Sequence, residues 1–390
     1  MQCRDGWGYS PGRPAIYDEG VPVVDRVSAA RASAIGRRYY GITGTAERQA
    51  SEHDDTFRLT AGDGTSRLLK IGAVDDVSGG AGGASFPTAV LAHLFAVAPE
   101  LPVQRVIATL DGRPEISGPD ELPGRLVRMT SWLDGALLGR EATGAALRRD
   151  IGATLARLNL ALRGLRHPGA RRTHRWDLQN FGRLRPLLAE LPDRGQSPAV
   201  RAALALTGLT ADTLRAALAG CLDHFDAAVA PRLAGLPVQV IHTDFHGENL
   251  LTAGGRVTGI LDFGDALAGP VAMDVGIAAC YQLGAASFGS GSGSGSAGGL
   301  LAPALDVVAG YHAVDPLDGV DLDLVAEFLM ARVAARIILS QAHAAREPAN
   351  RGYLLRRTPQ AIEHFDALLG LGRDALGGRL RAAIDLEEPR

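Results

Sequence analysis

The chain has 390 residues, of which 46% are hydrophobic and 21% charged, and its formal net charge is −3. This composition is typical of a globular protein, and the length leaves room for two lobes or domains. The charge balance argues against a nucleic-acid partner. The amino terminus has no apolar signal core and no long apolar run follows, so we expect no membrane association and a cytoplasmic location.

The first third of the chain predicts a small β-rich lobe. Residues 1–36 combine a Gly/Pro-rich arm with a weak helix, and residues 37–130 alternate between strand and turn signals. We expect strands at 40–42, 56–59, 67–71, 103–110 and 126–129, and a helix over 87–98. The glycine-rich stretch 78–85 lacks the Gly-Lys-Ser/Thr of a phosphate loop, so we interpret it as a connector.

The remainder, 131–390, predicts a large helical lobe. Residues 130–135 form the crossing between the lobes, and the Gly/Ser-rich stretch 287–299 is expected to be a flexible loop. Asp274 is interpreted as the N-cap of a helix over 273–283. The fold class is therefore α+β, with a small antiparallel sheet followed by a mostly helical lobe. The other helices are expected near 151–165, 181–190, 198–206, 211–230, 322–346 and 358–370.

The most informative stretch is 238–265, VQVIHTDFHGENLLTAGGRVTGILDFGD. It predicts short strands joined by a polar loop and a glycine turn, with Asp244, Asn249 and Asp262 at strand ends. Two carboxylates and an amide suit a hard cation such as Mg²⁺. The order His-x-Asp-x4-Asn and then Asp-Phe-Gly is that of the catalytic and metal loops of kinases. His242 is expected to brace the loop through hydrogen bonds.

Lys70 supports a phosphotransferase hypothesis. The 40 basic residues comprise 39 arginines and this single lysine. An ammonium is a compact point charge that a guanidinium does not replace. Lys70 falls near the end of the third predicted strand, where it could reach the α- and β-phosphates of a nucleotide. Asp244 would then accept the hydroxyl proton of the acceptor, and Asn249 and Asp262 would hold Mg²⁺.

These segments resemble the aminoglycoside phosphotransferase / choline kinase superfamily. HTDFHGENLL and GILDFGDALAGPVAMDVG carry the likeness, and ASEHDDTFRL, LPVQRVIATLDG, HRWDLQNF and AREPANRGYLL make the chain most similar to hydroxylysine-kinase-like proteins. The resemblance implies a protein-kinase-like two-lobed fold and a Mg²⁺-dependent ATP or GTP donor. It also implies that Ser51 lies in the nucleotide-covering loop, and that Ser131 and Leu133 lie in the hinge that reads the base.

Two positions depart from the family pattern. Thr243 replaces the usual glycine of the catalytic loop, which could alter its backbone geometry. The helix over 86–94 contains no acid to pair with Lys70, although Asp75 and Asp76 precede it. A non-catalytic kinase-like binding module is therefore an alternative hypothesis from another functional class. A protein kinase is disfavoured because no Ala-Pro-Glu follows Asp262.

The acceptor is expected to be a small cationic molecule that carries a hydroxyl group. Trp176 and Asp177 could receive an ammonium group, while Arg332 or Arg336, one helical turn apart, could receive a carboxylate. Packing and solvation of a helix face are the competing interpretation of all four residues. The leading hypothesis is a kinase for an amino-acid-like or amino-alcohol acceptor; an aminoglycoside or peptide-antibiotic phosphotransferase is the close alternative. The oligomeric state stays open.

Overall fold

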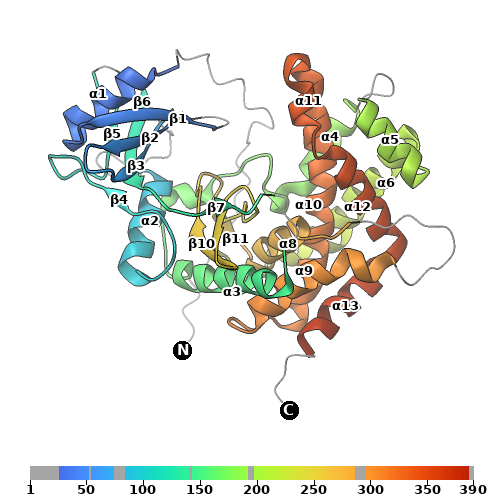
Figure 1. The fold of residues 1–390 in the computed structure, drawn as a ribbon. Coiled ribbons are helices and arrows are strands. Elements are labelled where there is room, and N and C mark those ends of the chain that lie inside the picture. Colours follow the sequence, from blue (N-terminus) through green and yellow to red (C-terminus); the bar gives the residue numbers. More distant parts are fainter. Residues whose placement is uncertain are drawn as a thin grey trace.

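The computed structural model describes residues 26–51, 54–73, 84–120, 122–139, 143–191, 197–285 and 296–385. Two lobes lie side by side (Figure 1), a small one built on an antiparallel sheet and a large one built of helices. This is the α+β architecture that the sequence predicts. No helix in the described ranges has the length and apolar character needed to cross a membrane.

The small lobe contains a six-stranded antiparallel sheet with the order β1-β2-β3-β6-β4, in which β5 also pairs with β6. Lys70 on β3 pairs with Arg128 on β6 in this register, so the two side chains lie on one face of the sheet. The strands are β1 (Gly44–Gln49), β2 (Asp55–Ala61), β3 (Ser66–Ala73), β4 (Val106–Ile107), β5 (Glu115–Ser117) and β6 (Arg125–Ser131).

Helix α1 (Ala29–Tyr40) packs on this sheet and corrects one prediction. The strand expected at 40–42 does not form, because the helix runs to Tyr40 and ends on Gly41, whose φ of 70° gives the left-handed cap that glycine adopts readily. The Ser28 side chain caps the first turn, so the helix begins later than the sequence pattern indicates. Tyr40 is buried in the small-lobe core with Phe57 and Leu69.

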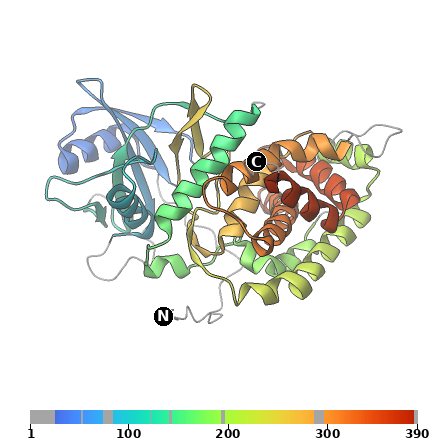
Figure 2. The same cartoon turned by 90° about the horizontal axis from the view of Figure 1, so that it is seen from below.

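The large lobe begins with β7 (Ala136–Leu137) and the long helix α3 (Ala145–Leu162), which lies at the boundary between the lobes (Figure 2). Short strands follow at the interior end of the lobe and long helices form its outer part. The remaining elements are 3-10 helices η1 (Pro168–Arg171) and η2 (Leu178–Leu184), α4 (Arg185–Leu188), α5 (Pro198–Thr207), α6 (Ala211–His224), the π-helical turn η3 (Phe225–Val229), α7 (Ala230–Leu233), β8 (Gln239–Ile241), β9 (Leu250–Ala253), β10 (Arg256–Ile260), β11 (Leu267–Gly269), α8 (Val271–Tyr281), α9 (Ser296–His312), α10 (Gly319–Arg346), η4 (Pro348–Asn350), α11 (Arg351–Leu354), α12 (Thr358–Leu371) and α13 (Arg373–Asp385).

Several elements differ from the sequence-based expectation. The expected flexible loop 287–299 is wrong at its end, because α9 already begins at Ser296; residues 286–295 lie outside the described ranges. Helices α9 and α13 were not predicted, since glycines near the start of α9, Pro303 inside it, and Gly377 and Gly378 inside α13 obscure the helical pattern. The strand expected over 103–110 shortens to β4, with a single bridge from Val103 to Ile260.

Helix α2 (Phe86–Val97) belongs by packing to the large lobe. Phe86, Val90 and Leu94 are buried in the same hydrophobic core as α3 and the large-lobe helices, while the inner residues of the sheet form a separate core. The helix is apolar over most of its length, and no acidic residue occurs in it. Most of the expected connector 78–85 lies outside the described residues.

Candidate active site

The catalytic loop follows β8 and is held in place by a side chain of α8. The buried carboxylate of Asp274 accepts the backbone N–H groups of His242 (3.1 Å) and Thr243 (2.7 Å). Asp274 lies inside α8 and Pro270 occupies the N-cap, so the interpretation of Asp274 as a cap is wrong. Burial raises its pKa. Its role in the structure is to set the start of the catalytic loop.

Thr243 occupies a backbone position that favours glycine. Its φ is 66°, in the left-handed region, where a β-branched side chain is strained. Its hydroxyl donates to the carbonyl of Asp265 at 2.8 Å, a bond that glycine could not make. The departure from the family pattern therefore leaves the loop geometry intact and adds a link to the segment after Asp262.

His242 joins the catalytic and metal loops. The ring is fully buried; Nε2 lies 3.0 Å from the carbonyl of Leu261, and Nδ1 accepts the backbone N–H of Asp244 at 3.3 Å. Leu261 in turn donates its N–H to the carbonyl of Asn249 at 2.9 Å. These hydrogen bonds hold Asp244 and Asn249 next to the residue that precedes Asp262, as the prediction of a bracing histidine requires.

Asp244 is surrounded by donors. Oδ1 accepts from Nη2 of Arg332 at 2.9 Å and lies 3.1 Å from Nε2 of His246, while Oδ2 accepts from Nδ2 of Asn249 at 2.7 Å. Burial acts to raise the pKa of Asp244, but His246 and Arg332 outweigh it and hold that pKa well below its usual range. The carboxylate is thus ionised and oriented, and 24% of the side chain stays exposed.

Asp262 faces the small lobe. Its Oδ2 pairs with Nζ of Lys70 at 3.2 Å, and its Oδ1 accepts the N–H of Gly264 at 2.9 Å. Burial opposes ionisation, yet Lys70, the Gly264 N–H and Arg128 together lower its pKa. The residue also has a positive φ of 56°. The open question of an acidic partner for Lys70 is answered, since Asp262 itself is that partner in this structure.

Mg²⁺ fits the oxygen atoms that these residues leave open. The amide nitrogen of Asn249 is turned to the carbonyl and carboxylate of Asp244, which leaves its oxygen for a ligand. An amide oxygen and an ionised carboxylate are hard ligands of the kind Mg²⁺ prefers. The described residues contain no group of three or more His, Cys, Asp or Glu side chains arranged for a metal. Asn249 and Asp262 offer oxygen atoms that fit Mg²⁺, and their role as its ligands stays a prediction.

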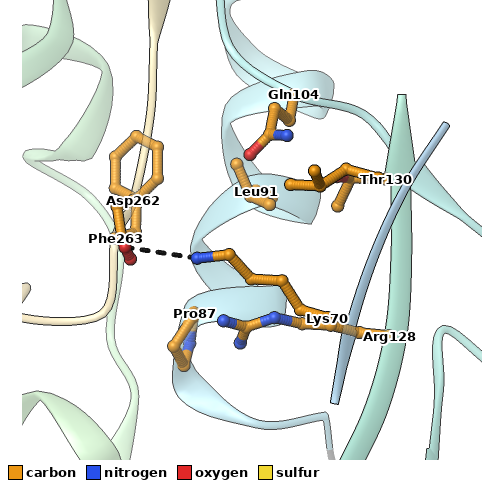
Figure 3. A pocket seen from close by; sticks show the side chains of 9 residues that line it. Lys70, Pro87, Leu91, Gln104, Arg128, Thr130, Asp262 and Phe263 are labelled. Carbon is orange, nitrogen blue, oxygen red and sulfur yellow. Dashed lines mark hydrogen bonds and ion pairs between the residues drawn. The ribbon is translucent and has the colours of Figure 1, made fainter. Parts of the chain in front are cut away.

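A pocket between the two lobes contains the Lys70–Asp262 pair. Figure 3 shows Lys70 reaching from the sheet toward Asp262, with Arg128 on the adjacent strand and α2 behind them. Two cationic side chains at one carboxylate suit a polyphosphate. The lining residues are Leu68, Lys70, Pro87, Leu91, Gln104, Arg128, Thr130, Asp262 and Phe263.

Helix α2 contains no acid, and the carboxylate of Glu115 binds its first turn instead of pairing with Lys70. From β5 its carboxylate accepts from the hydroxyl of Ser85 at 2.7 Å, and also from the backbone N–H of Ser85 and the hydroxyl of Thr88. It therefore anchors the first turn of α2 to the sheet. Asp75 and Asp76, the other candidates for pairing with Lys70, lie outside the described residues.

The residues expected to contact the base lie at the edge of the small lobe. Ser131 ends β6; its N–H donates to Arg105, and its hydroxyl accepts the Arg105 N–H at 2.9 Å. Leu133 lies two residues on, half-buried, in the segment that joins the lobes. Ser51 lies exposed just after β1. Their placement is compatible with the hinge and nucleotide loop, and their roles stay predictions.

The proposed acceptor residues separate into two groups. Asp177 is buried (3% exposed), and it accepts from the N–H and side chain of Gln179 and from Asn180. Burial raises its pKa. These contacts favour a structural role as the cap of η2, so Asp177 is a poor choice for a ligand carboxylate. Trp176, by contrast, lies against the guanidinium of Arg332, 4.6 Å from ring centroid to Cζ.

Arg332 reaches from α10 to the catalytic loop, and Arg336 packs against α8. The Arg332 side chain is 2% exposed and bonds Asp244 and the hydroxyl of Tyr281 (3.1 Å), with the Tyr281 ring on one side. Arg336 lies 4.9 Å from the same ring. The sequence named both arginines as receivers of a carboxylate, a role that stays a prediction. It gave no role to His246 or Tyr281 and a different one to Asp274, because the contacts of Tyr281 and Asp274 join distant segments.

Comparisons with known proteins agree with this geometry. Residues 45–317 match the model of the phosphotransferase enzyme family. Hydroxylysine kinase of Danio rerio is 23% identical over 374 residues, which span 90% of this chain and 94% of that protein. The structure of a microcompartment-associated aminopropanol kinase superposes with a TM-score of 0.58 at 18% identity, covering 90% of this chain and 100% of the other.

A spectinomycin phosphotransferase bound to ADP and spectinomycin has a TM-score of 0.56 at 12% identity, covering 90% and 99% of the two chains. These two structures establish the kinase-like fold. The family model covers more than half of the chain and includes both lobes, with Lys70, Asp244, Asn249 and Asp262 inside the match. The chain belongs to the phosphotransferase enzyme family.

Proposed function

We propose that the protein is a small-molecule kinase that transfers the γ-phosphoryl group of ATP or GTP to a hydroxyl of an amino-acid-like or amino-alcohol acceptor. The observation that carries the proposal is the joined set of Asp244, Asn249, Asp262 and Lys70 at the interface of the lobes. Phosphoryl transfer needs mainly positioning and neutralisation of charge, and this set provides both.

In the proposed reaction the acceptor hydroxyl donates a hydrogen bond to the carboxylate of Asp244. As the hydroxyl oxygen bonds to the γ-phosphorus, the bond from phosphorus to the β–γ bridging oxygen breaks and the nucleoside diphosphate leaves. The proton passes to Asp244 and then to solvent. Because the pKa of Asp244 lies far below neutrality, the carboxylate chiefly orients the hydroxyl and takes the proton late.

Lys70 releases Asp262 to contact the nucleotide phosphates, with Arg128 beside it in the same pocket. Mg²⁺, when bound by Asn249 and Asp262, supplies neutralisation of the phosphate charge. Ser51, Ser131 and Leu133 would contact the nucleotide. His246 and Arg332 keep the Asp244 carboxylate ionised and directed.

The acceptor class is supported by two lines of observation. The Danio rerio relative is named for hydroxylysine and a structural neighbour for aminopropanol, which are small hydroxylated amines. Arg332 adds a buried positive charge beside Asp244, and Arg336 adds another one turn along α10, an unfavourable environment for a polycationic aminoglycoside. An antibiotic phosphotransferase is the second candidate, since the spectinomycin enzyme shares the fold.

A nucleotide-consumption screen tests the proposal. Purified protein with Mg²⁺ and ATP or GTP is offered hydroxylysine, amino alcohols, hydroxylated amino acids, aminoglycosides and peptide antibiotics, and product is followed as phosphomonoester. We expect transfer to a hydroxylated amino acid or amino alcohol. Transfer only to antibiotics would favour the second candidate, and failure to bind Mg-nucleotide by calorimetry would favour a non-catalytic binding module.

A further inference from the structure

Two buried arginines lie one turn apart on α10, and the first of them, Arg332, contacts the carboxylate of Asp244. Arg332 is 2% exposed and Arg336 is 8% exposed. Within the described residues, the only carboxylate paired with Arg332 is that of Asp244, and the guanidinium of Arg336 meets only the Tyr281 ring and the Cys280 sulfur, 4.0 Å away. A buried charge without a full set of partners is costly, so this arrangement indicates a further anion.

The donors of Arg332 show where that anion would bind. Nη2 is used by Asp244 and Tyr281, but Nε and Nη1 are buried and have no hydrogen-bond partner among the described residues. The guanidinium is held between the rings of Trp176 and Tyr281, which fixes its plane. Both Trp176 and Tyr281 are partly exposed, so a modest movement of either side chain would open the donors to a ligand.

The surroundings favour an anion over a cation. Burial chiefly lowers the pKa of His364, and the positive charge of Arg336 lowers it further, so Arg336 is charged and close to this ring. Asp177, the nearest expected receiver of an ammonium in the sequence analysis, is already satisfied by Gln179 and Asn180. Asp244 is ionised, but three of its hydrogen-bond sites are filled.

We propose that Arg332 is a carboxylate receptor shared between the catalytic aspartate and the acceptor, with Arg336 as a second positive charge. The acceptor's carboxylate binds the unpaired N–H groups of Arg332, and this contact places its hydroxyl at Asp244. The inference rests on the proposed kinase function and narrows its acceptor to a hydroxylated amino acid. It also makes Arg332 the residue that couples acceptor recognition to the base.

The coupling has a geometric consequence. The guanidinium of Arg332 lies 2.9 Å from Oδ1 of Asp244, so a carboxylate docked on the same guanidinium holds the acceptor beside that aspartate. Lysine, an amino acid without the hydroxyl group, would dock in the same way, and Asp244 would then orient a water molecule in place of the hydroxyl.

The first test compares two acceptors that differ only in the carboxylate: hydroxylysine and its decarboxylated analogue. Wild type is expected to favour the acid by roughly 100-fold in kcat/KM, the scale of a bidentate charge-assisted contact. In Arg332→Met this preference collapses to within a few-fold, because kcat/KM falls far more for the acid than for its decarboxylated analogue. Arg336→Met, on the same helix face, is expected to raise KM for the acid more than it lowers kcat, because Arg336 contacts Tyr281 and Cys280 and has no contact with Asp244.

The second test needs no transfer product. Lysine is expected to stimulate nucleotide hydrolysis by wild type several-fold, its decarboxylated analogue is not, and Arg332→Met abolishes the stimulation. If Arg332→Met does not fold, Arg336→Met and the lysine stimulation of wild type decide the matter.

Equal use of both acceptors by wild type overturns the inference and leaves the kinase function standing. An equal loss of kcat/KM with both acceptors in Arg332→Met also overturns the inference. Weakened nucleotide binding in that variant does so too, because it would assign the anion at Arg332 to the nucleotide phosphates. Absence of transfer to any hydroxyl contradicts the proposed function itself.

Discussion

Asp274 provides the sharpest link between a buried contact and the catalytic loop. Its carboxylate is fully buried and accepts two consecutive backbone N–H groups, those of His242 and Thr243. In Asp274→Ala both donors lose their acceptor. A buried unsatisfied donor costs about 1–3 kcal/mol, so the free energy of unfolding is expected to fall by about 2–6 kcal/mol. Asp274→Asn keeps one acceptor oxygen and is expected to lose about 1–3 kcal/mol.

Urea unfolding, monitored by tryptophan fluorescence, measures the free energy of unfolding, and the rate of phosphoryl transfer reports on the position of the catalytic loop. Because Asp244 follows Thr243 directly, a shift of the loop by about 1 Å is expected to lower kcat by roughly 100-fold under conditions where the protein stays folded. Asp318→Ala is the matched control: it removes an N-cap of α10 and should cost about 1 kcal/mol with unchanged kcat. The reasoning is refuted if Asp274→Ala loses less than about 0.5 kcal/mol, or loses stability while kcat stays at the wild-type value.

Two further predictions concern local strain and pH. Thr243→Gly relieves the strain of the left-handed backbone but loses the hydrogen bond to Asp265, so its free energy of unfolding should stay within about 1 kcal/mol of wild type. Thr243→Val keeps the strain and loses the bond, so it should be about 1–2 kcal/mol less stable than wild type in the same urea assay. Equal stability of the two variants would contradict this reasoning. Burial, together with the charge of Arg336, lowers the pKa of His364 from 6.5 to about 4. The neutral ring therefore contributes about 3 kcal/mol to the stability of the fold above pH 6.5, and this contribution is lost as the pH falls toward 4. His364→Gln should flatten the dependence of unfolding free energy on pH in that window, and an unchanged slope would show that the ring does not titrate as described.

The sequence alone could predict the fold class and the centre of the site because both depend on local signals. Periodicity separates the β-rich lobe from the helical lobe, and Asp244, Asn249 and Asp262 lie within one short stretch whose spacing is diagnostic. The composition singled out Lys70, because it is the one lysine among the 40 basic residues. Its pairing with Asp262 depends on how the two lobes meet, which the sequence does not encode locally.

Other errors have physical reasons of the same kind. Asp274 looks like a helix cap because it is an acid near the start of a helical pattern, but Pro270 starts the helix earlier and turns the Asp274 carboxylate toward the catalytic loop. Tyr40 looks like a strand residue because it is aromatic and precedes an apolar position, yet Gly41 ends a helix there. His246 gains its importance only from the approach of Tyr281 and Asp244 in three dimensions.

The central claim is that Asp244 orients a hydroxyl for phosphoryl transfer. The most direct measurement follows the conversion of nucleotide and hydroxylated acceptor by ³¹P NMR in wild type and in Asp244→Asn, with nucleotide binding checked by calorimetry in both. We expect a phosphomonoester signal from wild type, a rate lower by about 100- to 10,000-fold in the variant, and similar Mg-nucleotide affinity. Transfer by Asp244→Asn at the wild-type rate would contradict the account.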